Sequence, residues 1–337
     1  MKSARSYKPT LMVGDQSYPA YELRYLLSYV SLHYGVEQRE QLCQEIGVGI
    51  NELQQMQLVF VWQVDYVMAY LKQREQDLEL GAKLGACYQV EDLGFMLNHL
   101  KECANLGDCL QFVLSHPELV GSFSDTLICN DAGVLSLRWL NTGKIDRERF
   151  GMQFQHSVCS MLALARQLTQ HPIALMQIHM AESARQSQFL QDFTQCDVQF
   201  EREFYQWSIG HQELMLPILY DFESVVMTEH ALGEASYIEQ ILNQLKASFP
   251  ELPKLEQMAL MNNMSDRTLR RRLASAGTSY QRLVDQVRSQ IAIGLIVQGD
   301  RSVVEIADLM GFSDVSHFRQ SFKHWLGYPP GHFIRKM

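Results

Sequence analysis

The sequence predicts an α+β domain followed by an all-α domain that contains two similar helix pairs joined by a long helix. Three observations support this fold class. Before residue 245, apolar residues at helical spacing are interspersed with hairpin-forming strand patterns, which is typical of an α+β domain. Residues 246–254 carry two prolines, and the charge balance changes sign there. Beyond them the pattern is helical throughout and contains a near-repeat of about 48 residues.

In the N-terminal part, apolar residues at helical spacing predict four helices, over residues 21–34, 52–74, 92–103 and 106–114. Two strands follow, over 123–129 and 134–140, and the residues Asn130-Asp131-Ala132-Gly133 between them favour a hairpin turn. The remaining elements are a long helix, two strands and a last helix, over residues 147–170, 173–180, 198–200 and 234–245.

The composition is that of an ordinary folded protein, with 337 residues, 47% hydrophobic and 20% charged. No apolar run approaches the ~20 residues that a bilayer span needs, and the basic N-terminus precedes no sustained apolar stretch. We therefore expect a cytoplasmic protein without membrane segments. The seven cysteines are odd in number and include no CxxC, so we expect free thiols instead of disulfides or zinc ligands.

The net charge of −9 is unevenly distributed. Residues 1–249 carry 17 Lys and Arg against 30 Asp and Glu, whereas residues 250–337 carry 12 against 8. An acidic body with a basic end suggests that only the C-terminal part contacts a polyanion. Pro250 and Pro253 interrupt any helix between the two parts. We predict a first domain over 1–245, a linker over 246–254 and a second domain over 255–337.

The near-repeat aligns residues 255–273 with residues 303–322. Beyond the matched serines the offset grows by one residue. The matched pairs are Ala259 with Ala307, Asn263 with Gly311, Met264 with Phe312, Ser265 with Ser313, Leu269 with Phe318, and Leu273 with Phe322.

Each matched position has a role in a helix-turn-helix unit. The small alanine lets two helices cross closely, and Asn263 or Gly311 tolerates the positive φ of the turn. The next apolar residue fills the gap between the helices, and Ser265 and Ser313 are predicted to cap the second helix of each unit. The last two apolar positions are an i, i+4 pair that packs inward, so the basic residues between them face outward. A plain helical hairpin explains one copy as well, but two matching copies favour two helix-turn-helix units.

Between the two copies, apolar residues at helical spacing predict a linker helix over residues 279–298. Such a helix is ~30 Å long at 1.5 Å per residue. Successive major-groove segments on one side of B-DNA lie ~34 Å apart. A rigid helix of this length can therefore hold two recognition helices on adjacent groove segments.

Residues 255–335 resemble the DNA-binding domain of AraC/XylS-type transcription regulators. The stretches that carry the resemblance are SDRTLRRRL at 265–273, GTSY at 277–280, EIADLMGFSD at 305–314 and FRQSFKHWLGYPP at 318–330. The resemblance implies that outward positions on the second helix of each unit read bases. Here those positions fall on Arg267, Arg270, Arg271, Ser316, Arg319 and Gln320.

Arginine at such a position suits guanine and glutamine suits adenine. The residues expected to contact the phosphates of the DNA backbone are Ser265, Arg272, Ser313 and Lys323. Two positions depart from the family pattern, since Asn263 stands where glycine is usual and Gln320 where arginine is frequent.

Residues 21–226 resemble, more loosely, the arabinose-binding-like effector domain found on one branch of this family. The stretches that carry this resemblance are DLGFM at 92–96, LGDCL at 106–110 and CDVQF at 196–200. It implies a domain that senses a small molecule and that can also form a homodimer. On the second hairpin strand, Arg138 and Trp139 are candidates for lining a ligand pocket. Equally, Arg138 can be a surface residue and Trp139 a core residue.

The sequence contains no nucleophile elbow, Walker loop, GxGxxG or HExxH motif, so no catalytic site, metal site or cofactor is predicted. We expect a transcription activator that binds double-stranded promoter DNA, a small-molecule effector and RNA polymerase. Two alternatives stay open: a regulator controlled by a protein partner or by cysteine oxidation, and an enzyme domain fused to a DNA-binding domain.

Overall fold

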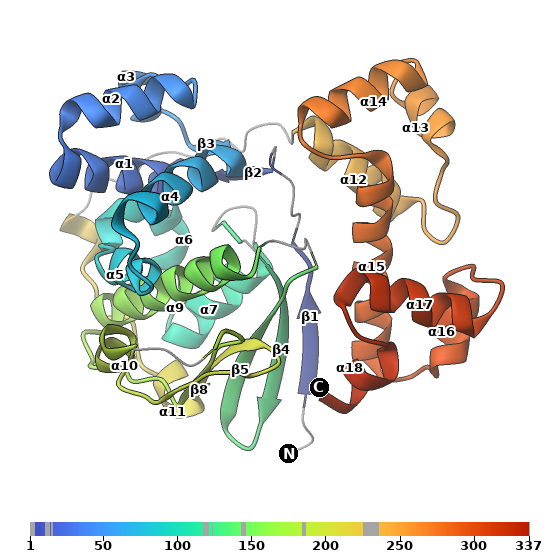
Figure 1. Cartoon of the computed structure of the whole chain (residues 1–337). Coiled ribbons are helices and arrows are strands. Elements are labelled where there is room, and N and C mark those ends of the chain that lie inside the picture. Colours follow the sequence, from blue (N-terminus) through green and yellow to red (C-terminus); the bar gives the residue numbers. More distant parts are fainter. Residues whose placement is uncertain are drawn as a thin grey trace.

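The computed structural model describes residues 4–10, 14, 16–116, 121–122, 124–142, 146–183, 187–224 and 236–336. An α+β part forms one side of the molecule, and helices α12 to α18 run as a column along the edge of its sheet (Figure 1). No helix in these ranges is long and apolar enough to cross a membrane.

The strands are β1 (Ala4–Lys8), β2 (Ser17–Pro19), β3 (Leu58–Phe60), β4 (Asp125–Asp131), β5 (Val134–Leu140), β6 (Gln177–His179), β7 (Val198–Gln199) and β8 (Tyr205–Gly210). The helices of the α+β part are α1 (Ala20–Tyr34), α2 (Val36–Glu45), α3 (Ile50–Leu53), α4 (Val61–Glu75), α5 (Leu80–Ala86), η1 (Val90–Met96), α6 (Leu97–Leu100), α7 (Leu106–Ser115), α9 (Arg147–Thr169), α10 (Gln188–Thr194), α11 (His211–Leu214) and η2 (Phe222–Ser224). The column contains α12 (Tyr237–Ala247), α13 (Leu255–Met261), α14 (Asp266–Ser275), α15 (Tyr280–Gln298), α16 (Val303–Leu309), α17 (Val315–Leu326) and α18 (Pro330–Lys336).

Six strands form one mixed sheet in the order β1-β4-β5-β8-β6-β7, in which only β6 and β7 pair in parallel. The predicted hairpin of β4 and β5 is confirmed. Its two loop residues, Ala132 and Gly133, have φ of 48° and 83°, as a type I′ turn requires. Phe123, the predicted first residue of the hairpin, lies outside the described residues.

Both faces of this sheet are covered, and alternate side chains along each strand point to opposite faces. Leu137 and Trp139 of β5 and Trp207 of β8 belong to the main core of the α+β part. Leu127 of β4 and Leu140 of β5 instead belong to the hydrophobic cluster of α15 to α18. The hairpin thus provides core residues to both halves of the molecule.

Three predicted helices, over 21–34, 106–114 and 147–170, are confirmed as α1, α7 and α9. The single helix predicted over 52–74 is wrong. Residues Leu58–Phe60 pair with Ser17–Pro19 as a two-stranded sheet, and this pairing separates α3 from α4. The helix predicted over 92–103 is also broken, because Gly94 at φ 57° separates η1 into two pieces.

The strand predicted over 173–180 is shorter, as β6 (Gln177–His179), and the one over 198–200 is β7. Elements that the sequence patterns do not predict include strands β1, β2 and β8 and helices α2, α5, α10 and α11. β8 lies in the middle of the sheet, so its burial comes from both neighbouring strands and both covering layers.

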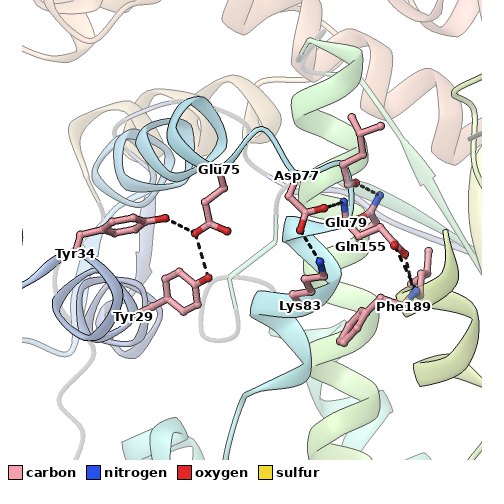
Figure 2. A network of polar contacts seen from close by, with 10 residues as sticks. Tyr29, Tyr34, Glu75, Asp77, Glu79, Lys83, Gln155 and Phe189 are labelled. Carbon is pink, nitrogen blue, oxygen red and sulfur yellow. Dashed lines mark hydrogen bonds and ion pairs between the residues drawn. The ribbon is translucent and has the colours of Figure 1, made fainter. Parts of the chain in front are cut away.

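Polar contacts hold the corner between α4 and α5 (Figure 2). The hydroxyls of Tyr29 and Tyr34 on α1 both donate to Oε1 of Glu75, at 3.1 and 2.7 Å. The Glu79 carboxylate accepts the backbone N–H groups of Phe189 and Leu190 in the first turn of α10. A carboxylate there pairs with unsatisfied N–H groups and with the positive end of the helix dipole.

Helix α12 packs with the C-terminal helices. Ile238, Ile241, Leu242 and Leu245 share one hydrophobic cluster with residues of α13, α14 and α15. The division at 246–254 stays a prediction. The packing of α12 favours a division before Ser236, with α12 in the C-terminal domain.

Candidate functional sites

Helices α13 and α14 form a compact pair built on the predicted positions. Ala259, Leu269 and Leu273 are buried at their contact. Asn263 in the turn has φ of 53°, which confirms that this position needs a left-handed backbone. Ser265 caps α14, because its Oγ accepts the backbone N–H of Thr268 at 3.2 Å.

The exposed face of α14 is strongly basic. At about 100° per residue, Arg267 and Arg271 lie opposite the buried leucines and point away from the protein. Arg270 lies to one side, where its guanidinium is 4.0 Å from the Glu256 carboxylate of α13. Arg272 lies to the other side, with its guanidinium 5.2 Å from the centre of the Tyr237 ring of α12.

Helices α16 and α17 form the second pair. Ala307, Phe318 and Phe322 are buried as predicted, and Gly311 in the turn has φ of 74°. Ser313 was expected to cap the second helix, and that expectation is wrong. The cap is one residue further on, because Oδ1 of Asp314 accepts the backbone N–H of His317 at 2.8 Å.

This shift follows from the extra residue that separates the two copies after the serine. It also places a carboxylate at the start of α17, where the first pair has a neutral hydroxyl. The outward residues of α17 are all exposed, namely Ser316, Arg319, Gln320 and Lys323. Ser316, Gln320 and Lys323 lie opposite the buried aromatic residues, and Arg319 lies on the flank.

Helix α15 separates the two pairs (Figure 1). Its 19 residues correspond to ~28 Å at 1.5 Å per residue. Both pairs pack on it, and it is buried over much of its length. The two exposed faces therefore flank one continuous helix whose length is close to one turn of B-DNA.

The same helix is docked on the α+β part through a buried polar cluster. Nε2 of Gln290 donates to the backbone oxygen of Thr10 at 2.6 Å and to Oδ1 of Asp125 at 3.0 Å. The Asp125 carboxyl also accepts from Tyr7, Thr142 and the Thr10 backbone N–H. Burial raises the pKa of Asp125, and these hydrogen bonds oppose the rise.

A cavity of about 170 Å³ lies inside the α+β part. Its walls come from α1, η1, α7, α9 and the inner face of the sheet, and most of them are apolar. Of the two hairpin residues with open roles, Trp139 lines the cavity. Arg138 faces the C-terminal helices, with its guanidinium 4.4 Å from the centre of the Phe204 ring.

The buried side chains that line this cavity include the polar groups of Glu22 from α1, Tyr88, and His156 from α9. Nε2 of His156 is 3.2 Å from Oε1 of Glu22. Neither of these atoms, nor the Tyr88 hydroxyl, has a hydrogen bond of acceptable geometry within the described residues. A buried polar group without a partner costs roughly 1–3 kcal/mol, so such a group calls for an explanation.

Burial lowers the pKa of His156, against the opposing charge of Glu22, so the ring is neutral near pH 7 and the contact with Glu22 is not a salt bridge. Burial and then the Glu22 charge raise the pKa of Tyr88. Sequence reasoning missed all three residues. One signal was available, since Glu22 interrupts an otherwise apolar face of α1. Within the described ranges, no group of three or more His, Cys, Asp and Glu side chains could hold a metal ion.

Comparison with known families identifies the chain. Residues 38–218 match the family described as the arabinose-binding domain of AraC transcription regulators, and residues 258–336 match a helix-turn-helix domain. The protein belongs to the AraC family of transcription regulators. Both α13–α14 and α16–α17 of this AraC-family regulator lie almost entirely in the helix-turn-helix match, and the cavity lies largely in the arabinose-binding match.

Relatives of this AraC-family regulator extend over different shares of the chain. It is 27% identical to the ornithine utilization regulator of Pseudomonas aeruginosa over 265 residues, which cover 75% of this chain and 78% of that protein. It is 30% identical to the transcriptional activator RhaS of Klebsiella pneumoniae over 118 residues, 35% of this chain and 42% of that protein. The crystal structure of CdpR from Pseudomonas aeruginosa covers 94% of this chain and 98% of its own, with 18% identity and a TM-score of 0.43.

Proposed function

We propose that this AraC-family regulator activates transcription by inserting α14 and α17 into successive major-groove segments of promoter DNA. The observation that carries the proposal is the pair of exposed faces at the two ends of α15. Two matching helix-turn-helix units, joined by a 19-residue helix that is ~28 Å long, suit a site with two short blocks about one DNA turn apart.

The exposed positions also suggest how sequence is read. Arg267 and Arg271 are central on α14, and an arginine there can donate two hydrogen bonds to guanine. Ser316 and Gln320 are central on α17, where glutamine suits adenine. Arg270 and Arg319 lie on the flanks and remain predicted base contacts with less direct access.

Phosphate contacts are proposed at Ser265, Arg272, Ser313 and Lys323. The N-terminus of α14 presents backbone N–H groups and the Ser265 hydroxyl, which favour an anion, although Asp266 places a carboxylate in the same turn. The N-terminus of α17 carries the Asp314 carboxylate, which weakens the case for phosphate near Ser313.

Regulation is proposed to come from a small molecule bound in the α+β part, with activation through contact with RNA polymerase. The protein is also proposed to be able to form a homodimer. The name of the activator RhaS supports activation, and the cavity supports a ligand. Control by cysteine oxidation is less favoured, because burial raises the pKa of Cys43, Cys103, Cys109, Cys129, Cys159 and Cys196 and so disfavours their reactive thiolates. No feature among the described residues of the α+β part favours an enzyme.

The test is selection of random duplex DNA by the full-length protein, followed by Arg271→Ala on the selected site. We expect the variant to lose discrimination at one base position by ~1–3 kcal/mol. Arg282→Ala on α15, outside both recognition helices, is the matched control and should leave base preference unchanged.

Uniform weakening on every DNA sequence by Arg271→Ala, with a shallower salt dependence, would make Arg271 a phosphate contact. Recovery of no enriched sequence by the full-length protein, with or without effector, and by residues 236–337 would contradict the DNA-binding proposal. Transcription from the selected promoter with purified RNA polymerase separates activation from repression.

A further inference from the structure

The cavity in the α+β part is the right size for a small organic molecule. Its volume of about 170 Å³ slightly exceeds the roughly 150 Å³ of an engineered cavity that binds benzene. Leu93, Met96, Leu100, Leu162 and Leu164 form much of the wall. Trp207 also lines it, and its Nε1–H has no hydrogen bond among the described residues. An occupant therefore has an apolar body of about one aromatic ring, or of a short alkyl chain, and little room for a second polar group.

One end of this cavity is polar. Glu22, Tyr88 and His156 come from different segments and are only 6%, 1% and 3% exposed. Glu22, Tyr88 and His156 all line the cavity, and Oε1 of Glu22, the Tyr88 hydroxyl and Nε2 of His156 lack a well-formed hydrogen bond among the described residues. Such atoms are costly to bury unless something pairs with them, which makes this end suited to the head group of a ligand.

The charge at this end is negative. No lysine or arginine is among the described residues that line the cavity. His156 is neutral near pH 7 for the reason given above, so the Glu22 carboxylate is the charged group that a ligand meets. A ligand carboxylate or phosphate would be repelled there, whereas an ammonium group can pair with Glu22 and offset its burial. Tyr88 and Trp139 also line the cavity, and the face of an aromatic ring attracts a cation.

We propose that this cavity binds a small primary amine with an apolar body, and that its ammonium group pairs with the Glu22 carboxylate while Tyr88 and His156 accept further hydrogen bonds. This inference rests on the proposed function of the α+β part as a small-molecule sensor, and it names the chemical class of the effector.

The experiment compares three probes of nearly equal size on the full-length protein by calorimetry: 2-phenylethylamine, 2-phenylethanol and phenylacetate. We expect the amine to bind at least about tenfold more tightly than the alcohol, with the weakest binding or none for phenylacetate. Equal binding of the amine and the alcohol, tighter binding of phenylacetate, or no binding by the amine would each overturn the proposal. This ranking uses the unaltered protein, so it does not depend on any variant being folded.

Glu22→Gln keeps the shape of the side chain and removes its charge. We expect it to weaken binding of the amine at least tenfold and to leave binding of the alcohol within about threefold. Glu37→Gln on the exposed surface of α2 is the matched control and should change neither. An unchanged amine affinity in a folded Glu22→Gln protein would refute the role of Glu22.

Binding of the selected DNA is measured on the same preparations. If the amine fails to bind while DNA is still selected, only the inference about the amine is wrong. If the full-length protein, with or without the amine, and residues 236–337 all select no DNA, the proposed regulatory function fails, whether or not the amine binds.

Discussion

Gln290 connects the helix that carries both recognition helices to the α+β part. Its side-chain amide donates to Thr10 and Asp125, which belong to the segment after β1 and to β4. Replacing Gln290 with methionine keeps the length of the side chain and removes both donors. We expect Gln290→Met to loosen the docking of α15 without unfolding either half, because the surrounding apolar cluster is retained.

The expected magnitude follows from the groups involved. A neutral hydrogen bond contributes roughly 0.5–1.5 kcal/mol and one to a charged group roughly 1.5–3 kcal/mol, so the two losses amount to ~2–4 kcal/mol. Against this, the buried Oε1 of Gln290 has no partner within the described residues, and its removal returns ~1–3 kcal/mol. With the middle of each range, about 3 kcal/mol lost and about 2 kcal/mol returned, the net effect is about 1 kcal/mol, which corresponds to roughly fivefold more frequent opening of the interface.

Hydrogen exchange of the Thr10 amide is the direct assay, because this N–H donates to Asp125 at 2.6 Å inside the interface. Its exchange should accelerate by the stated factor in Gln290→Met. Gln281→Met is the control on the same helix, since Gln281 is exposed and bonds only to Asp285 one turn away. Exchange of Thr10 that changes less than about twofold would show that these hydrogen bonds do not hold the docking.

Three further predictions concern the folding of each half, measured by thermal and urea unfolding. Gly85→Ala should destabilise the α+β part by at least ~1–3 kcal/mol, because a Cβ there would lie 2.2 Å from the backbone oxygen of His156. In Gly294→Ala on α15, the added Cβ would have its nearest neighbour 3.8 Å away, so this variant should instead stabilise the protein by up to ~1 kcal/mol. If both variants changed the stability in the same direction, the close-approach argument would be refuted. Asn263→Ala should cost ~1 kcal/mol and Asn263→Gly almost nothing, because the turn needs positive φ; an equal cost for both would contradict this. Burial lowers the pKa of His156, so below pH ~6.5 the unfolded chain takes up a proton more readily than the folded chain, and the protein becomes less stable as the pH falls. His156→Gln should make this loss of stability at low pH smaller, and an unchanged pH profile would refute the argument.

Much of the C-terminal domain was predictable because its structure depends on local interactions. The turn residue with positive φ, the cap and the i, i+4 apolar pair all act within one helix pair, so each leaves a pattern in adjacent residues. The one wrong assignment, the cap of α17, came from a choice between the neighbours Ser313 and Asp314.

The α+β part was less predictable, because its elements depend on distant partners. Residues 58–60 have apolar side chains that suit a helix and a strand equally well. They form a strand because they pair with residues 17–19. β8 is a strand for the same reason, since β5 and β6 flank it.

By itself the sequence determined that this protein has an α+β part, a basic C-terminal domain and two outward-facing basic helices joined by a long one. These features follow from periodicity, charge and short-range turn chemistry. Only the tertiary structure decided which residues share the cavity and how α15 is docked. Glu22, Tyr88 and His156 come together because α1, the segment before η1 and α9 pack around one space, and Gln290 meets Asp125 because α15 lies along β1. Contacts between residues more than a hundred positions apart depend on how whole elements pack, and that packing leaves no local pattern in the sequence.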